Sequence, residues 1–169
     1  AQQRLIFEEL VAHQISLLTR RAYIRQIAAP RFSNSKVLAK QLLSTLPFAM
    51  TAAQKRVSKE ILHDLKQEQP MLRLLQGDVG AGKTLVAAVA ACHALEANWQ
   101  VALMAPTEIL AEQHYLNFKR WFEPLGIQVA WLSGKQKGKA RTQAEQQIKA
   151  GHAQLIIGTH ALFQDSIEF

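Results

Sequence analysis

The chain reads Gly77-Asp78-Val79-Gly80-Ala81-Gly82-Lys83-Thr84 near its middle, and this stretch decides the fold that we expect. It satisfies every fixed position of the G-x-x-x-x-G-K-[ST] phosphate loop, a motif that is meaningful only between a strand and a helix. The apolar residues Met71 to Leu75 before it predict a buried strand, and residues 85–97 after it predict a helix. The sequence therefore predicts a loop that holds a nucleoside triphosphate.

The residue types in this loop suit phosphate binding. Because glycine has no Cβ, the backbone at Gly77, Gly80 and Gly82 can bring its N–H groups close to a phosphate. The positive N-terminal end of the following helix adds to the attraction for an anion. Lys83 supplies a charge for the β- and γ-phosphates, and the Thr84 hydroxyl is placed to ligate Mg²⁺. We therefore expect Lys83 and Thr84 to be the catalytic residues of the loop.

Composition favours a globular protein with an acidic partner. Of the 169 residues, 49% are apolar and 20% are charged, which is ordinary for a globular domain. No apolar run approaches the roughly 20 residues of a membrane span, and the N-terminus does not read as a signal peptide, so we expect a cytoplasmic protein without membrane contact. The net charge of +7 favours nucleic acid as the partner. The single cysteine, Cys92, excludes an internal disulfide and is expected in the core.

The organisation of the chain changes near residue 47. Residues 2–27 and 36–46 predict two helices, separated by Pro30 and the Ser-Asn-Ser cluster at 33–35, and Thr51 can cap a third helix over 52–67. Short apolar strands then alternate with helices: strands are expected at 71–75, 101–105, 127–132 and 155–157, and helices at 83–97, 108–122 and 139–150. This alternation predicts a three-layer α/β fold, a parallel sheet covered on both faces, whose ligands bind at the carboxyl ends of the strands.

Three further segments lie where strands are expected to end. In Ala105-Pro106-Thr107-Glu108, the hydroxyl of Thr107 can cap the next helix or contact a phosphate of a nucleic-acid strand. Residues 133–141 place four cations in a glycine-containing loop, which suits contacts with a DNA backbone and equally suits a solvated surface; they are Lys135, Lys137, Lys139 and Arg141. Gly158-Thr159-His160 is the third possible backbone contact.

In this order, the motifs resemble the first motor domain of the RecG family of bacterial superfamily 2 DNA helicases. The resemblance covers residues 48–169 and rests on Leu46-Pro47-Phe48 with Thr51 and Gln54, the phosphate loop, and residues 104–114, 134–141 and 158–161. It assigns residues 1–46 to a helical linker from the DNA-binding wedge domain of that family. Residues 47–169 then form the N-terminal part of the first RecA-like motor domain.

The resemblance implies an ATP-dependent DNA helicase that remodels branched double-stranded DNA, such as stalled replication forks and Holliday junctions, in repair and recombination. It implies that Phe48 and Gln54 help to recognise adenine, and that residues 77–85, through Leu85, bind ATP and Mg²⁺. Contacts with DNA are implied for Pro106, Thr107, Gly134, Lys137, Lys139, Arg141, Gly158 and Thr159. The wedge domain and second motor domain of the parent chain are further expected partners.

One departure from the family pattern affects the chemistry. No apolar strand ending in Asp-Glu follows the phosphate loop, and the second motor domain with its arginine finger is missing. We therefore expect a truncated sheet. Because phosphoryl transfer depends on such charges being in place, we also expect the chain to bind nucleotide weakly and to hydrolyse it negligibly. Two other interpretations stay open: a P-loop nucleotide or small-molecule kinase, and a non-enzymatic DNA-binding module with a vestigial P-loop.

Overall fold

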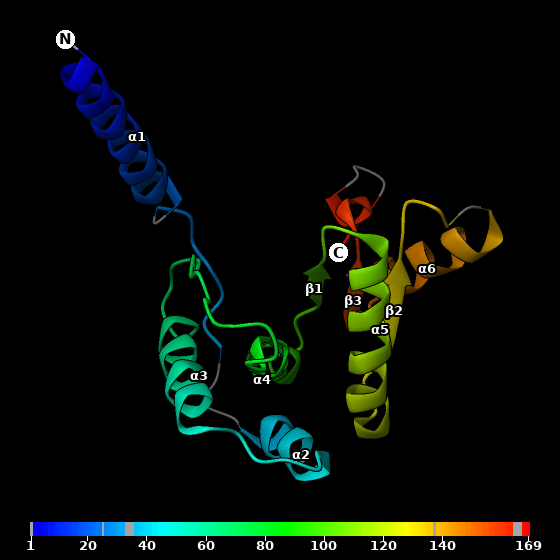
Figure 1. Ribbon diagram of the computed structural model, residues 1–169. Coiled ribbons are helices and arrows are strands. Elements are labelled where there is room, and N and C mark those ends of the chain that lie inside the picture. Colours follow the sequence, from blue (N-terminus) through cyan, green and yellow to red (C-terminus); the bar gives the residue numbers. More distant parts are fainter. Residues whose placement is uncertain (1, 25, 33–35, 137, 164–166) are drawn as a thin grey trace.

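The computed structural model describes residues 2–24, 26–32, 36–136, 138–163 and 167–169, and these form a parallel sheet with flanking helices (Figure 1). The elements, in order, are α1 (Gln2–Ile24), α2 (Val37–Thr45), α3 (Ala52–Asp64), α4 (Lys83–Glu96), β1 (Val101–Met104), α5 (Glu108–Phe122), η1 (Glu123–Leu125), β2 (Val129–Leu132), α6 (Lys139–Lys149), β3 (Leu155–Gly158) and η2 (His160–Phe163). The predicted α/β class, preceded by N-terminal helices, is confirmed.

Strand β3 lies at the centre of the sheet. In the described part of the chain the order is β1-β3-β2, and both pairings are parallel. The register places Leu155 beside Val101 and Val129, and Gly158 beside Met104 and Leu132. All four residues of β3 are buried, whereas β1 alternates between half-buried and exposed positions. The ends of all three strands therefore meet at one edge of the sheet.

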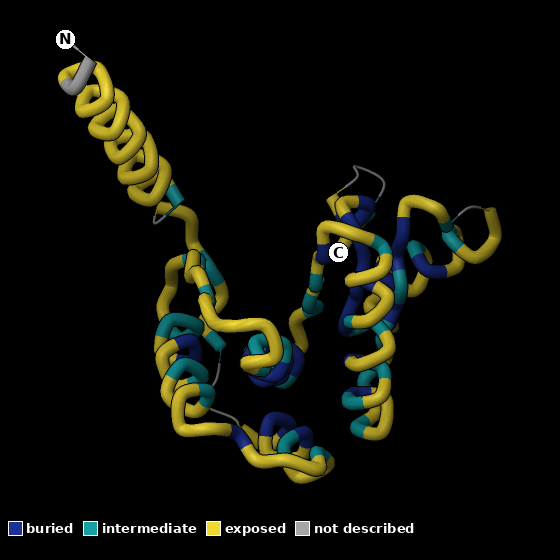
Figure 2. The backbone as a smooth tube through the Cα atoms, in the orientation of Figure 1, coloured by how far each residue is buried: buried dark blue, intermediate teal, exposed yellow. Residues whose placement is uncertain are grey.

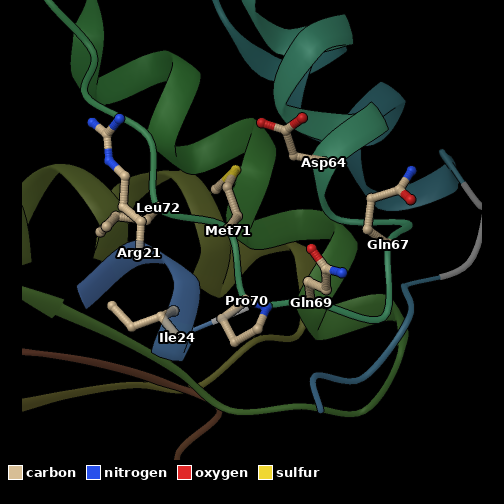
Figure 3. A pocket seen from close by; sticks show the side chains of 8 residues that line it. All are labelled: Arg21, Ile24, Asp64, Gln67, Gln69, Pro70, Met71 and Leu72. Carbon is tan, nitrogen blue, oxygen red and sulfur yellow. The ribbon is translucent and has the colours of Figure 1, made fainter. Parts of the chain in front are cut away.

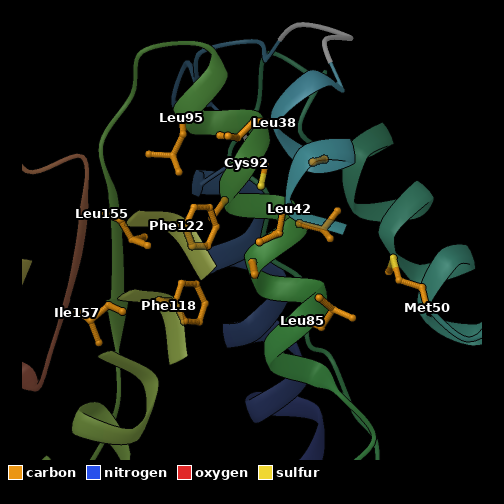
Figure 4. Packing of buried hydrophobic residues seen from close by; sticks show 14 residues of the cluster. Leu38, Leu42, Met50, Leu85, Cys92, Leu95, Phe118, Phe122, Leu155 and Ile157 are labelled. Atoms are coloured by element: carbon orange, nitrogen blue, oxygen red, sulfur yellow. The ribbon is translucent and has the colours of Figure 1, made fainter. Parts of the chain in front are cut away.

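Two hydrophobic clusters cover the two faces of the sheet. Side chains alternate along a strand, so Leu155 and Ile157 point to one face, where Phe118 and Phe122 of α5 pack with α4 and α2 (Figure 4). Ile156 points to the other face and packs against α6. The predicted three-layer arrangement is confirmed by these clusters.

Helix α4 is the centre of the larger cluster. Helices α2 and α3 and strand β1 all pack against it. Cys92 of this helix has no exposed surface, and its burial raises the pKa of the thiol to about 12. Eight of its 14 residues are buried: Leu85, Val86, Ala88, Val89, Ala91, Cys92, His93 and Leu95.

The predicted strand over Met71 to Leu75 does not form, so this prediction was wrong. Leu72 and Leu74 are 71% and 80% exposed, and no strand of the described chain pairs with the segment. A strand needs a neighbour to satisfy its backbone N–H and C=O groups, and apolar composition alone does not supply one. The chain therefore enters the phosphate loop from an unpaired segment.

Helix α1 projects away from the other elements, and of its residues 4–24, whose burial is described, all but Ile24 are exposed (Figures 1 and 2). Apolar side chains of this helix are exposed too; the exposed fractions of Leu5 and Phe7 are 60% and 66%. In the described residues, neither this helix nor any other is both long and apolar enough to cross a membrane.

Replacing Gly158 by alanine is expected to destabilise the sheet. A Cβ at this position would overlap the carbonyl oxygen of Leu132 in the neighbouring strand. Overpacking of this kind costs about 3 kcal/mol, because backbone on both strands must move. Urea unfolding measures the loss. Gly134→Ala is the control, since a Cβ there meets no atom within 4 Å; an equal loss in both variants would contradict the packing argument.

Candidate functional site

The phosphate loop ends in the first turn of α4. Gly80 and Gly82 have φ values of +82° and +75°, in the left-handed region that favours glycine. The amide of Ala81 donates to the carbonyl oxygen of Asp78 at 3.1 Å and closes a turn between them. Residues 77–81 are exposed, and the first amides of α4 have no carbonyl within the helix to bond, as at any helix N-terminus. The loop therefore presents backbone donors to a ligand.

The side chain of Lys83 bends back over the loop. Its Nζ donates to the carbonyl oxygens of Gly77 and Asp78 at 2.6 and 2.7 Å. An ammonium group in this position lies beside the loop backbone, where the oxygens of a phosphate chain can reach it. Thr84, the next residue, is half-buried in the same turn. The structure thus brings both predicted catalytic residues to the N-terminus of α4.

Gln54 links α3 to the phosphate loop, a contact that the sequence analysis did not anticipate. Its Oε1 accepts from the amide of Thr51 at 2.9 Å, and its Nε2 donates to the carbonyl oxygen of Ala81 at 2.8 Å. The first bond belongs to a capping box, which the Thr-x-x-Gln spacing indicates in the sequence. A Cβ at Gly82 would overlap Nε2 of Gln54, so this contact also requires glycine. Phe48, the other predicted adenine contact, is 51% exposed ahead of α3.

A second site lies at the carboxyl ends of the three strands. A cavity of about 380 Å³ there is lined by four residues with predicted DNA contacts: Pro106, Thr107, Gly134 and Thr159. The hydroxyl of Thr107 accepts from the amide of Leu110 at 3.4 Å, so Thr107 also caps α5, as the alternative interpretation predicted. Thr107 is exposed, whereas Thr159 is buried at the base of η2. Three separate strand ends thus contribute to one cavity.

Glu108 holds the lysine that lines this cavity. Its Oε2 forms an ion pair with Nζ of Lys135, and its Oε1 accepts from the hydroxyl of Ser133 at 2.8 Å. Ser133 Oγ accepts in turn from the amide of Lys135 at 3.2 Å. Hydrogen bonding to Lys135 and then to Ser133 lowers the pKa of the Glu108 carboxyl, and the carboxylate raises the pKa of Lys135. These bonds fix the loop after β2 against the start of α5.

The other residues with predicted DNA contacts do not line this cavity. Arg141 donates to Glu145 at 2.7 Å, one turn further along α6, and the i,i+4 spacing of the two residues is visible in the sequence. Lys139 is exposed at the start of α6, and Gly158 is buried within β3. Lys137 lies outside the described residues. Of the described cations among the four that the sequence analysis named in residues 133–141, Lys135 is the one that lines the cavity.

Another cavity lies apart from both sites. It measures about 230 Å³ and lies between the C-terminal end of α1, the C-terminal end of α3 and residues 69–72 (Figure 3). Asp64, which lines it, forms an ion pair with Arg73 at 2.7 Å. Among the residues that the structure describes, no group of three or more His, Cys, Asp or Glu side chains could hold a metal ion.

Comparisons with known proteins agree on one family. The family model of the DEAD/DEAH box helicase matches residues 51–168. The chain is 56% identical to "ATP-dependent DNA helicase RecG" of Escherichia coli O157:H7 and 57% identical to the protein of the same name from Pasteurella multocida (strain Pm70). Each match covers 100% of this chain and 24% of the relative. The chain thus spans about a quarter of the length of these relatives.

A solved structure gives the same result. "Structure of RecG bound to three-way DNA junction" matches the chain with a TM-score of 0.89 and 39% sequence identity. This match covers 100% of the chain and 23% of that structure's chain.

Lys135→Met is expected to raise the pKa of the Glu108 carboxyl, because the lysine is the main cause of its lowering. In the parent protein the pair of Glu108 and Lys135 stabilises the folded state at pH values above the ordinary carboxyl pKa. This stabilisation is lost as the pH falls through the lowered pKa of Glu108. NMR titration of the carboxyl carbon measures the change. Lys139→Met is the control, since Lys139 has no ion pair with Glu108; an unchanged Glu108 pKa in Lys135→Met would contradict the assignment.

Proposed function

The chain belongs to the DEAD/DEAH box helicase family, and from this premise we propose that it is the ATP-binding part of a DNA helicase that remodels branched double-stranded DNA in repair and recombination. Support comes from the names of its relatives and from the matched structure, in which RecG is bound to a three-way DNA junction. The observation that carries the proposal is Lys83 Nζ, which bends over the carbonyl oxygens of the phosphate loop. Because the chain spans a quarter of its relatives, the activity of the whole protein is part of the proposal.

ATP would be held by the loop residues 77–85. Lys83 would neutralise charge on the phosphates, and Thr84 would ligate Mg²⁺, which supplies positive charge for phosphoryl transfer. Phe48 and Gln54 would contact the adenine. Since Gln54 also bonds to Ala81, one side chain would connect the base to the phosphate loop. No Asp-Glu pair occurs in the 169 residues, so this stretch would bind ATP without the carboxylates needed for rapid hydrolysis.

The cavity at the strand ends would receive the DNA backbone. Thr107, Gly134 and Thr159 line it from three different strand ends, and Lys135 supplies a cation. Contacts of this kind position a strand without reading its sequence. The other predicted contacts with DNA stay predictions. Three of them are cations in residues 137–141, namely Lys137, Lys139 and Arg141, and the other two are Pro106 and Gly158.

The domain assignment is also a proposal. Residues 1–46 would link the motor to a DNA-binding wedge domain, and residues 47–169 would form the N-terminal part of the first motor domain. The family match, which begins at residue 51, supports the boundary near residue 47. A protein that acts on bacterial DNA would work in the cytoplasm.

Lys83→Ala is expected to weaken the binding of Mg-ATP about ten- to a hundredfold, because a charged hydrogen-bond partner of the phosphates is lost. Isothermal titration calorimetry measures the dissociation constant. The control is Lys149→Ala, which removes the same charge far from the loop; Lys149 pairs with the exposed Glu168. This variant should bind Mg-ATP as tightly as the parent does. Equal affinity in both variants would mean that the loop is vestigial.

Lys135→Ala is expected to weaken binding of a forked DNA duplex and to reduce its dependence on salt. Each phosphate contact releases counterions, so losing one should lower the slope of log affinity against log salt by about 0.9. Fluorescence anisotropy at several salt concentrations gives the slope. Lys149→Ala again serves as the control, and a slope that is unchanged by Lys135→Ala would place this lysine off the DNA.

A further inference from the structure

An apolar groove separates α2 from α3. Both helices pack against α4, and the cavity between them measures about 200 Å³. Its floor is formed by five apolar residues, four of them buried: Ala39, Leu43, Met50, Leu62 and Val89. Figure 4 shows Met50 at the margin of the core cluster, on the side of this groove. The volume is below the range of pockets that enclose a whole small-molecule ligand, and it suits one large apolar side chain.

Four lysines form the rim of the groove. Lys36 and Lys40 lie one turn apart on the α2 side, and Lys55 and Lys59 lie one turn apart on α3. All four are exposed, and none has an ion pair with another described residue. Like charges at i and i+4 on a helix are destabilising, and here two such pairs face the same groove.

The acidic residues of α3 do not offset this charge. Glu60 and Asp64 both bind Arg73, at 3.0 and 2.7 Å. None of the residues that line the groove is acidic. The groove therefore combines an apolar floor with a rim of uncompensated positive charge.

Ser58 adds an unused polar group. Its hydroxyl is buried at the groove, between Lys55 and Lys59 in sequence, and no described residue bonds to it. Buried hydroxyls in folded proteins nearly always have a hydrogen-bond partner. A bound chain would supply one through its backbone.

We propose that this groove is a docking site for an acidic peptide segment of a partner protein. One large apolar side chain of the peptide fills the floor, its carboxylates meet the four lysines, and its backbone bonds to Ser58. Buried apolar anchors dominate the affinity of such interfaces, and complementary charge selects the partner. A nucleic-acid backbone would satisfy the lysines and leave the apolar floor without a partner.

The groove shares no residue with the proposed nucleotide and DNA sites, although Lys55 directly follows Gln54 in α3. Val89 and His93, which line the groove, lie about 9 and 15 Å along α4 from Lys83, at 1.5 Å per residue. No residue of the groove lines the cavity at the strand ends. Failure of ATP or DNA binding would therefore leave this proposal untouched, and the reverse also holds.

The first test measures binding of a fluorescein-labelled peptide, Glu-Asp-Glu-Phe-Glu-Asp-Glu, to the full 169-residue chain by fluorescence anisotropy. We expect binding that weakens at least about tenfold in Lys40→Glu/Lys59→Glu, since two favourable contacts become repulsive. We expect a peptide with Ser in place of Phe to bind the parent chain more weakly by a similar factor. Lys66→Glu/Lys149→Glu makes the same change of charge away from the groove and should bind as the parent does.

The second test locates the peptide. The chain has three methionines, so labelling their methyl carbons gives three NMR signals: Met50 in the groove, and Met71 and Met104 elsewhere as internal controls. We expect the peptide to shift the Met50 signal alone. The proposal is overturned by an absence of binding up to about 1 mM peptide, by an equal loss in both double variants, or by a Met50 signal that a DNA duplex shifts and the peptide does not.

Discussion

The burial of helix α4 is the constraint on which the other parts of the structure depend. Helices α2 and α3 and strand β1 pack against it, and its apolar residues form the middle of the larger core cluster. A helix that is buried along most of its length cannot shift without opening this core. Its N-terminus is consequently held in place, and the phosphate loop that leads into it is held at that end. The nucleotide site is thus positioned by packing that lies behind it.

The loop is fixed at a second point by a polar contact. Gln54 bonds both to the cap of its own helix and to the carbonyl oxygen of Ala81, so α3 and the loop share one side chain. The strand-end cavity has a comparable device, in which Glu108 holds Ser133 and Lys135. In both places a side chain at a helix N-terminus orders a loop from elsewhere in the sequence.

The sequence predicted most of the fold because its signals were local. Helical periodicity, caps and short apolar runs correctly located the helices and three of the strands. The prediction of a strand over Met71 to Leu75 was wrong because apolar composition cannot show whether a strand has a neighbour to pair with. The phosphate loop was recognisable from its own residue spacing together with the helix that follows it, whereas the bond from Gln54 to Ala81 joins residues 27 positions apart and has no local signature. The ion pair of Glu108 with Lys135 was hidden for the same reason, and the family match now sets aside the kinase interpretation.

Cys92 lies on the most protected side of α4, and its thiol is held in the protonated form by burial. Thiolates, not thiols, react with alkylating reagents and disulfides, so this group is inert while the core is closed. A cysteine introduced on the surface would be modified alone, and the native one need not be removed first. The wild-type background thus permits single-site attachment of a fluorophore or spin label, by which movements of α1 or of the strand-end cavity could be followed.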